Sequence, residues 1–364
     1  MLTLLLALLL QQPAGRLSPQ RLWEAQLPTP SFSVSVAPGG MCTAVLLQTS
    51  AEVRDEAGRR MWASPVSIDP QDAGWTRIVL SPQCDWTATS INRTGRPPVL
   101  HIFNKDGFRA SFTLDGMLGL QPNGTNVSSL AISPDGKLLA VGFEGGLVWV
   151  VGKNGVLQNR LGPFSASEIE VTFTADSKRL LMKGWSVTGL LDFDGTWWWK
   201  ADARNLAASD NLSVFAALTA PMHGPQRGEV SIVNSQGRTV WSEVAWNARM
   251  AIAPDGSFVA LSTTSPKQHH SPSAVPDFMD SPEVWLRDKA GTVLAHRSFN
   301  GNVVGVSSDS RCVVLQADTD LVGVNRALKE VWRLRNAKSP QFEGNIIVEN
   351  LGNSLRASRM PGCK

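Results

Sequence analysis

One short turn sequence recurs along this chain at a fairly regular interval, and it constrains the fold more than any other feature. It is clearest as SPDG at residues 133–136 and APDG at residues 253–256. Weaker copies begin at Ala37, Ser81, Thr174, Ala208, Ser307 and Glu349. The mean interval is about 45 residues, a length typical of propeller blades. A repeat of this length is one supersecondary unit that buries its apolar face only by stacking on its neighbours.

Each copy of the turn separates two apolar runs, such as residues 130–132 (LAI) and 138–141 (LLAV) around SPDG. Proline presets φ at the second turn position, and Asp and Gly accept the conformations that reverse a chain. We therefore predict an antiparallel hairpin of strands a and b in each unit. A second turn, with Asp or Asn three residues before Gly, predicts strands c and d. Its copies begin at Asp55, Asn104, Asp192, Asn234 and Asp288.

A tryptophan follows several of these second turns. Trp62, Trp199 and Trp241 each stand four residues after the Gly, and Trp332 holds the same place in a unit without the Gly. Four antiparallel strands in each of seven or eight units indicate an all-β fold, the β-propeller.

The a–b turn resembles that of WD-repeat-like propellers. The c–d pattern V-x-D-x-x-G-x-x-x-W resembles the tryptophan-docking repeat of pyrroloquinoline-quinone-type propellers. The strict Gly-His and Trp-Asp dipeptides of WD repeats are absent, which is typical of the degenerate, mostly bacterial relatives. The resemblance implies a fold and leaves the function open, because both groups include scaffolds, binding proteins and enzymes.

The two ends of the chain are predicted to share one blade. Residues 22–27 (LWEAQL) precede the first a–b turn as residues 240–245 (VWSEVA) precede the turn at Ala253, which indicates an outer strand d. Residues 344–360 supply an a–b pair at the right interval. Pairing of the N- and C-terminal strands removes exposed sheet edges. We predict a ring of eight blades, with seven as the alternative, in a single domain over residues 15–364.

The first residues predict export. Residues 2–10 read LTLLLALLL, which is shorter than the about 20 residues that span a bilayer. The run has the length of a secretory apolar region, with Ala14 as the cleavage residue. We expect a signal peptide at residues 1–14 and a secreted or periplasmic protein without a membrane span. A buried N-terminal strand or helix is the alternative, since no Lys or Arg precedes the run.

The net charge and the cysteines limit which partners, disulfides and metal sites can be expected. The net charge is +3 and no Lys/Arg run occurs, so neither nucleic acid nor an anionic membrane is expected as a partner. Cys42, Cys84, Cys312 and Cys363 permit one or two disulfides among three full pairings, with isolated buried thiols as the alternative. No C-x-x-C spacing exists, so no zinc or thioredoxin-type site is expected.

Long irregular segments gather on one predicted face. Antiparallel blades place the b–c and d–a loops on one side and the a–b and c–d turns on the other. Residues 92–98, 118–128, 219–229 and 264–282 all belong to the first group. Loops on a rigid scaffold often carry function, although insertions without a role look the same. The candidate partner-binding residues are Asn92, Arg93, Arg96, His223, Gln226, Arg227, His269, His270 and Asp277.

Other chemistry is weakly supported by the sequence. His269 and His270 are adjacent, a spacing that does not direct both rings at one metal ion. The tryptophans at 197–199 are expected between neighbouring blades rather than as a ligand platform at the loops. The chain has no G-x-S-x-G, P-loop, H-E-x-x-H or C-x-x-C-H motif, and no cofactor is expected.

The sequence therefore favours a binding or scaffolding module over an enzyme. We expect a monomer that recognises a protein or cell-envelope partner through the face of b–c and d–a loops. The alternative is a hydrolase or lyase with a polar site in the propeller channel, where Asp or Glu would act as the general base.

Overall fold

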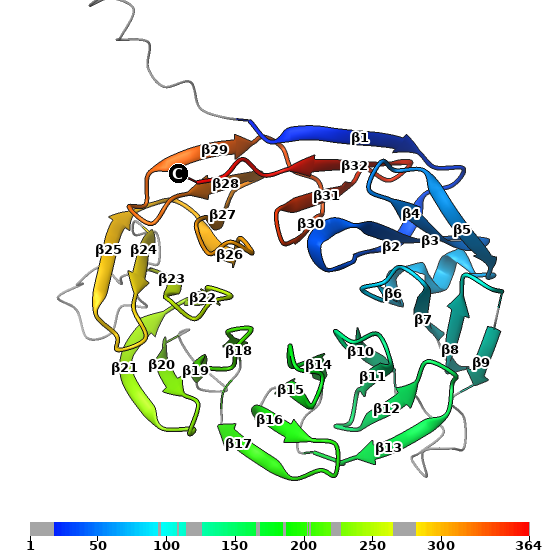
Figure 1. The fold of residues 1–364 in the computed structure, drawn as a ribbon, viewed down its shortest axis with the longest axis horizontal. Helices are drawn as coiled ribbons and strands as arrows, with labels where there is room; N and C mark the ends of the chain where they lie inside the picture. The colour runs from blue at the N-terminus through cyan, green and yellow to red at the C-terminus, as the bar shows by residue number, and fades with distance from the viewer. Residues whose placement is uncertain are drawn as a thin grey trace, which may run out of the picture.

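The computed structural model describes residues 18–363 except 94–95, 108, 114–125, 165–167, 185–186, 202, 204, 220–226 and 265–281. The described strands form eight four-stranded antiparallel sheets, arranged as blades around a central channel (Figure 1). This confirms the predicted eight-bladed β-propeller. The predicted signal peptide at residues 1–14 lies outside the described residues.

Within each of the first seven blades, the strands follow chain order from the channel to the rim. Blade 1 contains β2 (Ser31–Val36), β3 (Cys42–Leu47), β4 (Ser50–Asp55) and β5 (Arg60–Pro65), and blade 2 contains β6 (Thr76–Leu80), β7 (Trp86–Arg93), β8 (Arg96–Asn104) and β9 (Arg109–Thr113). Blade 3 contains β10 (Val127–Ile132), β11 (Leu138–Phe143), β12 (Val148–Gly152) and β13 (Leu157–Leu161), and blade 4 contains β14 (Ile169–Phe173), β15 (Arg179–Gly184), β16 (Thr188–Asp192) and β17 (Trp197–Ala201).

The second half of the ring repeats this order. Blade 5 contains β18 (Asn205–Ala208), β19 (Val214–Thr219), β20 (Arg227–Asn234) and β21 (Thr239–Trp246), and blade 6 contains β22 (Arg249–Ile252), β23 (Val259–Thr264), β24 (Pro282–Arg287) and β25 (Val293–Ser298). Blade 7 contains β26 (Asn302–Val306), β27 (Val313–Ala317), β28 (Asp320–Val324) and β29 (Glu330–Leu334). Two 3₁₀ helices, η1 (Pro38–Gly40) and η2 (Pro70–Trp75), complete the described elements.

Blade 8 closes the ring with strands from both ends of the chain. It combines β30 (Pro340–Glu343), β31 (Ile346–Asn350) and β32 (Ser354–Arg359) with β1 (Gln20–Gln26) as its outer strand. The predicted shared blade is therefore confirmed, with one correction. The turn at Glu349 connects strands b and c, because β30 begins earlier than the predicted pair and supplies strand a. The a–b turn is a shorter link at Gly344, which has φ +61° and lacks the signature.

The c–d turns place glycine where the backbone requires positive φ. Gly237 and Gly291 have φ of 74° and 86°. A Cβ on Gly237 would lie 2.5 Å from the indole of Trp199 in the preceding blade. Trp241 lies in the same way against Gly291, and Trp23 of β1 lies against Gly58 across the ring closure. At these three interfaces the outer-strand tryptophan of one blade therefore packs on the turn glycine of the next.

A one-residue β-bulge precedes the docking position in several outer strands. The register shifts leave Met61, Trp198, Val240 and Leu294 without a ladder partner. These four side chains are between 41% and 52% exposed, because a bulge turns the extra residue out of the alternation. Trp198 still contacts the next blade, since its ring centroid lies 6.3 Å from that of Phe215 in blade 5, so the expectation that all three tryptophans at 197–199 lie between blades holds for Trp198 only in part.

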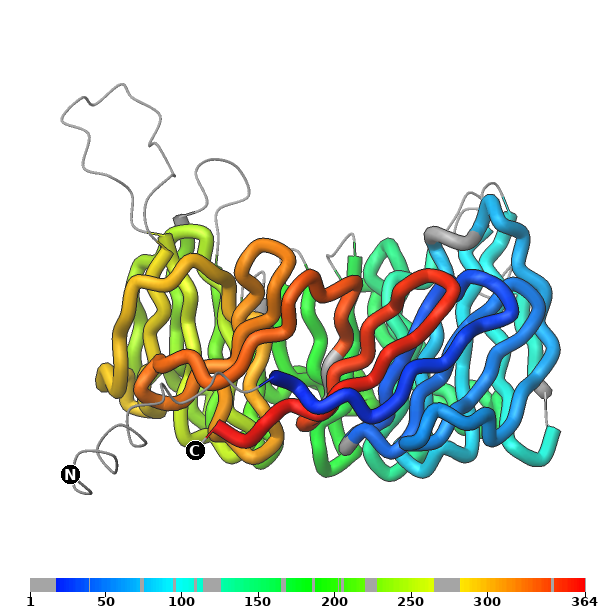
Figure 2. The backbone as a smooth tube through the Cα atoms, turned by 90° about the horizontal axis from the view of Figure 1, so that it is seen from above, coloured from blue at the N-terminus to red at the C-terminus, as the bar shows by residue number. Residues whose placement is uncertain are grey.

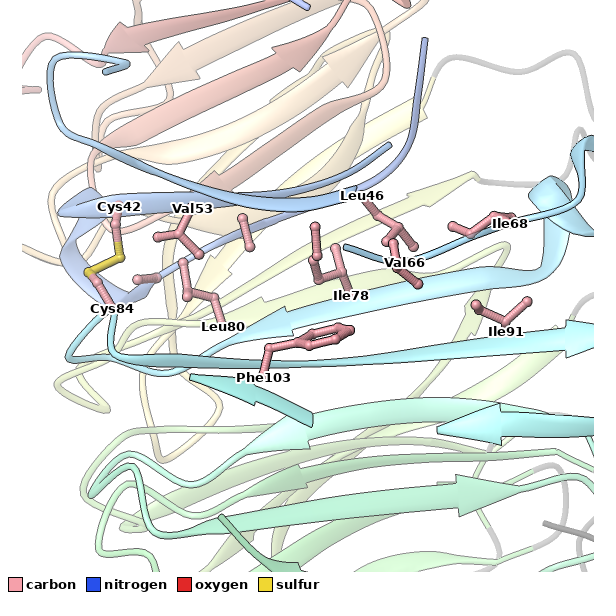
Figure 3. Close-up of a cluster of buried hydrophobic side chains, with 13 residues drawn as sticks. Cys42, Leu46, Val53, Val66, Ile68, Ile78, Leu80, Cys84, Ile91 and Phe103 are labelled. Carbon is pink, nitrogen blue, oxygen red and sulfur yellow. A yellow bond between two sulfur atoms is a disulfide. The ribbon is translucent and has the colours of Figure 1, made fainter. Parts of the chain in front are cut away.

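The hydrophobic core is a ring of clusters between neighbouring blades. Figure 3 shows the cluster between blades 1 and 2, where Leu46 and Val53 meet Ile78, Leu80 and Phe103. This arrangement follows from the repeat, since each unit buries its apolar faces only against its neighbours.

Both disulfides join segments that belong to different blades. Cys42 at the start of β3 is bonded to Cys84 in the a–b turn of blade 2. Cys312, just before β27 of blade 7, is bonded to Cys363 in the tail that follows β32. The pairing that the sequence left open is thus resolved, and all four cysteines take part.

Candidate functional site

The ring has two chemically different faces. We call the side of the a–b and c–d turns the turn face, and the side of the b–c and d–a connections the loop face. Figure 2 shows the ring edge-on, with the β31–β32 connection of the loop face at the top and the C-terminus below. β1 and β32 pair antiparallel, from Gln20 opposite Arg359 to Gln26 opposite Ser354. The first residues of β1 and the last residues of β32 therefore both lie on the turn face.

Polar groups of several a–b turns on the turn face bond within the protein. The Ser133 hydroxyl donates to Asp135 Oδ1 at 2.6 Å and accepts the N–H of Leu138 at 2.9 Å. Equivalent bonds begin at Ser209 and Ser307. Neighbouring turns are also joined, since the Asp135 N–H donates to Ser177 Oγ at 3.0 Å. The turn signature is therefore a hydrogen-bonded joint between blades.

These bonds set the ionisation of the turn carboxylates. Partial burial of Asp135 opposes its ionisation, but the Ser133 hydroxyl and the Lys137 N–H outweigh this effect and lower the pKa of Asp135. At Asp288 the Thr292 N–H is the largest influence and lowers the pKa. Both carboxylates therefore act as hydrogen-bond acceptors that hold their turns together.

Among the predicted partner-binding residues, the structure places the side chains of three. Asn92 is buried, and its amide bonds both backbone groups of Val127 in blade 3, at 2.8 and 2.9 Å. The Arg93 guanidinium donates twice to Pro97 O. Arg96 is exposed at the start of β8. Asn92 and Arg93 thus hold the β7–β8 connection, and Arg96 is the exposed member of the three.

The remaining predicted residues are less well defined. The backbone of Arg227 belongs to β20 and pairs with Trp246. His223, Gln226, His269, His270 and Asp277 lie outside the described residues. Within the described part of the chain, no group of three His, Cys, Asp or Glu side chains could hold a metal ion. The helices of that part are also too short to span a bilayer.

A cavity of about 840 Å³ lies in the channel, against the inner strands of five blades. Blades 1, 2 and 3 contribute β2, β6 and β10, blade 4 contributes the start of β14 and the end of β15, and blade 8 contributes β30. The start of an a strand and the end of a b strand lie at the loop face, so blades 3 and 4 line the cavity from that side. Its polar lining comprises Ser33, Ser35, Arg77, Ser128, Ser129, Glu168, Glu170, Lys183 and Gln341.

Two opposite charges in this lining have no partner in the part of the chain that the structure describes. Lys183 Nζ lies 3.1 Å from Glu170 Oε1, so these two charges compensate each other. Among the described residues, no side chain or backbone group bonds the Arg77 guanidinium or the Glu168 carboxylate. Counting bonds to described residues only, the cavity therefore holds one unpaired cation on blade 2 and one unpaired anion on blade 4.

Trp75 adds an exposed aromatic ring beside Arg77. It ends η2 in the d–a connection before β6 and is 62% exposed. Thr76 is extended, with φ −95° and ψ 148°, so the side chains of residues 75 and 77 leave the backbone on the same side.

The sequence analysis missed Trp75, Arg77 and Glu168. One signal was available, because Arg77 interrupts the apolar run of the inner strand TRIVL in β6. A charged residue in an inner strand of a propeller indicates a channel-facing position. That Arg77 and Glu168 line one cavity could not be found in this way, because it depends on the curvature of the ring.

No protein-family model matches this chain, and no curated protein matches its sequence. Solved structures resemble it over nearly its whole length. Sqt1 of Saccharomyces cerevisiae is 12% identical with a TM-score of 0.63, covering 95% of this chain and 100% of that chain. The Dos1 propeller is 14% identical with a TM-score of 0.59, covering 95% and 96%. Hydrazine synthase of Kuenenia stuttgartiensis is 12% identical with a TM-score of 0.54, covering 97% and 99%.

At these identities the likeness shows the fold alone. The class of protein is a closed eight-bladed β-propeller, and the WD40-like interpretation of its repeat is supported at the level of fold. The resemblance to pyrroloquinoline-quinone-type and bacterial propellers stays a prediction.

Proposed function

We propose that this chain is an exported, monomeric propeller that binds or scaffolds a protein or cell-envelope partner through its loop face. The observation that carries the proposal is the contrast between the two faces. The a–b turns bond internally and to one another, whereas the loop face exposes Trp75 and Arg96 and opens on a cavity with free charges. Tryptophan and arginine are the residue types most enriched at the energetic centres of protein interfaces.

The two disulfides support export. Disulfides persist in secreted and periplasmic proteins and are rare in the reducing cytosol. All four cysteines of this chain are paired, and both pairs hold neighbouring blades or the tail together. This pairing supports our proposal of a secreted or periplasmic protein.

The channel gives less support to the hydrolase or lyase alternative. General acid–base chemistry needs a positioned side chain that takes or gives a proton, most often histidine. Among the described lining residues there is no histidine, and Glu170 is held by Lys183, which leaves Glu168 as the one free carboxylate. Binding is therefore the function that we propose.

The test is a pull-down from cell-envelope extract of the source organism, with the full chain as bait. Two loop-face variants are used: Arg96→Glu, and replacement of residues 265–281 by a short Gly-rich turn. The second is feasible because Thr264 and Pro282 are ladder partners in β23 and β24. The matched control is Lys153→Glu, an exposed charge reversal in a c–d turn.

We expect the loop-face variants to recover at least tenfold less of a specific partner, while Lys153→Glu recovers the wild-type amount. Equal partner sets for all four proteins, or a loss confined to Lys153→Glu, would overturn the proposal.

A further inference from the structure

The cavity at the channel mouth joins free polar groups from blades that are far apart in sequence. We propose that it anchors one segment of the partner protein, a segment with a carboxylate that binds Arg77 and a basic side chain that binds Glu168. This inference rests on the proposed function and names the chemistry that the loop face recognises.

Arg77 is positioned to capture a carboxylate. Thr76, Ile78 and Leu80 of β6 are buried, so Arg77 belongs to the opposite side of the strand and lines the cavity. Its guanidinium has no partner among the described residues. A guanidinium on a rigid strand matches the planar, bidentate geometry of a carboxylate.

Neutral groups extend this site toward blades 1 and 8. Ser33 and Ser35 lie on one side of β2 and line the cavity, while Val34 between them is 6% exposed. Gln341 of β30 joins them. Among the described residues no bond occupies these hydroxyl and amide groups. They can therefore donate to a carboxylate oxygen or to the backbone carbonyls of a bound peptide.

The side of the cavity formed by blade 4 favours a positively charged group of the ligand. Glu168 precedes β14 in blade 4, and the neighbouring Lys183 is compensated by Glu170. The free charges are thus positive on blade 2 and negative on blade 4, with blade 3 between them. A purely anionic ligand would leave Glu168 unpaired beside it, so a ligand with groups of both signs is favoured.

Trp75 argues for a protein segment rather than a free small molecule. Its ring lies outside the cavity lining yet only two residues from Arg77, and it is 62% exposed. A cavity of about 840 Å³ holds a drug-sized ligand. A peptide that fills it can continue across Trp75, where a large aromatic surface adds affinity.

The test uses two random 12-residue peptide libraries selected on the full chain. In one library the C-terminus of each peptide is fused to the display protein, so only Asp and Glu side chains offer carboxylates. In the other the C-terminus is free. We expect enriched peptides that combine a carboxylate with Lys or Arg. The library that yields them shows whether the carboxylate comes from a side chain or from the terminus.

Affinities of the selected synthetic peptides are then measured by fluorescence anisotropy. Arg77→Ala should weaken binding about 10- to 100-fold, and Trp75→Ala about tenfold. Glu168→Gln should remove the preference for a basic residue. The matched control is Arg249→Ala, an exposed arginine on the inner strand of blade 6 outside the cavity lining, which should change affinity less than twofold. Unchanged circular dichroism and melting temperature establish that each variant is folded.

Enrichment of no peptide, peptides without a carboxylate, or unchanged affinity in Arg77→Ala would overturn the inference. The outcome is separable from that of the proposed function. If Arg77→Ala and Trp75→Ala still recover the partner that the Arg96→Glu and 265–281 variants lose, the loop face is the binding surface and the cavity is not its anchor.

Discussion

The turn face and the loop face are built from the same strands, but the polar groups of the a–b turns and those around the channel cavity differ in how they are bonded. On the turn face, Ser133 and Asp135 bond each other and the turn of the next blade. On the loop face, Asn92 and Ser129 make similar links between blades at the level of the strands. On blade 2, by contrast, Trp75 is exposed and the Arg77 guanidinium has no bonding partner among the described residues.

On our proposal, the turn face stabilises the fold and the loop face binds a partner. Each blade of the ring must be held to the next one, and the hydrogen bonds of the regular turns contribute to this. Groups that remain unbonded add little to folding and are available for a partner. Changes on the turn face should therefore alter the free energy of unfolding, and changes on the loop face should alter binding.

The largest expected effect comes from the tail disulfide on the turn side. The double variant Cys312→Ser/Cys363→Ser removes a bond that closes 51 residues of sequence separation. We expect a loss of about 4 kcal/mol in the free energy of unfolding, measured by urea denaturation with tryptophan fluorescence. Cys42→Ser/Cys84→Ser, which spans 42 residues, should lose a similar amount. Losses below about 1 kcal/mol in both would contradict the structural role of these bonds.

The docking of tryptophans on turn glycines is the next comparison. Gly237→Ala places a Cβ against Trp199 and also strains a backbone with φ 74°. Gly107→Ala strains a similar backbone, with φ 85°, but its Cβ meets nothing within 4 Å. We expect about 1 kcal/mol for Gly107→Ala and about 2–3 kcal/mol for Gly237→Ala, from the same denaturation assay. Equal costs would show that docking adds nothing to the interface.

We expect acid to lower the free energy of unfolding through the carboxylates of the turn face. The pKa values of Asp135 and Asp288 are lowered in the folded protein, so their contribution is present above the unfolded value near 3.9 and is lost as pH falls through and below it. In Asp135→Asn/Asp288→Asn the amides do not titrate. The fall in unfolding free energy between pH 5 and pH 3 should therefore be smaller by about 0.5 kcal/mol, because exposed carboxylates contribute little. A steeper fall in the variant would reverse the sign of this argument.

The smallest effect on folding should come from the loop face. Arg96→Glu changes an exposed side chain at the start of β8. We expect its free energy of unfolding to stay within about 0.5 kcal/mol of the wild type, while partner recovery falls. If the substitution destabilises the fold by more than about 1 kcal/mol, Arg96 belongs to the framework and not to the free surface.

Much of the ring could be predicted because its signals are local. Pro, Asp and Gly within four residues define a turn, and seven of the proposed a–b turns lie between strands a and b as expected. The eighth copy at Glu349 was misplaced because blade 8 turns from strand a to strand b at Gly344 without that chemistry. Trp198 is more exposed than expected because a bulge, which local alternation does not reveal, turns it partly outward while its ring still contacts Phe215 of the next blade.

The candidate site was less accessible to the sequence. Asn92 and Arg93 looked like loop residues, but their polar groups turn inward to backbone atoms. Arg77 and Glu168 lie 91 positions apart and converge only because strands from several blades surround one channel.

The recurring turn by itself determined that this chain folds as four-stranded blades in a ring, because period and turn chemistry act over a few residues and do not need the rest of the molecule. Tertiary structure alone decided which cysteines bond to each other and which charged side chains line one cavity in the channel. These pairings depend on the rotation from one blade to the next, a property of the assembled repeat rather than of any single copy.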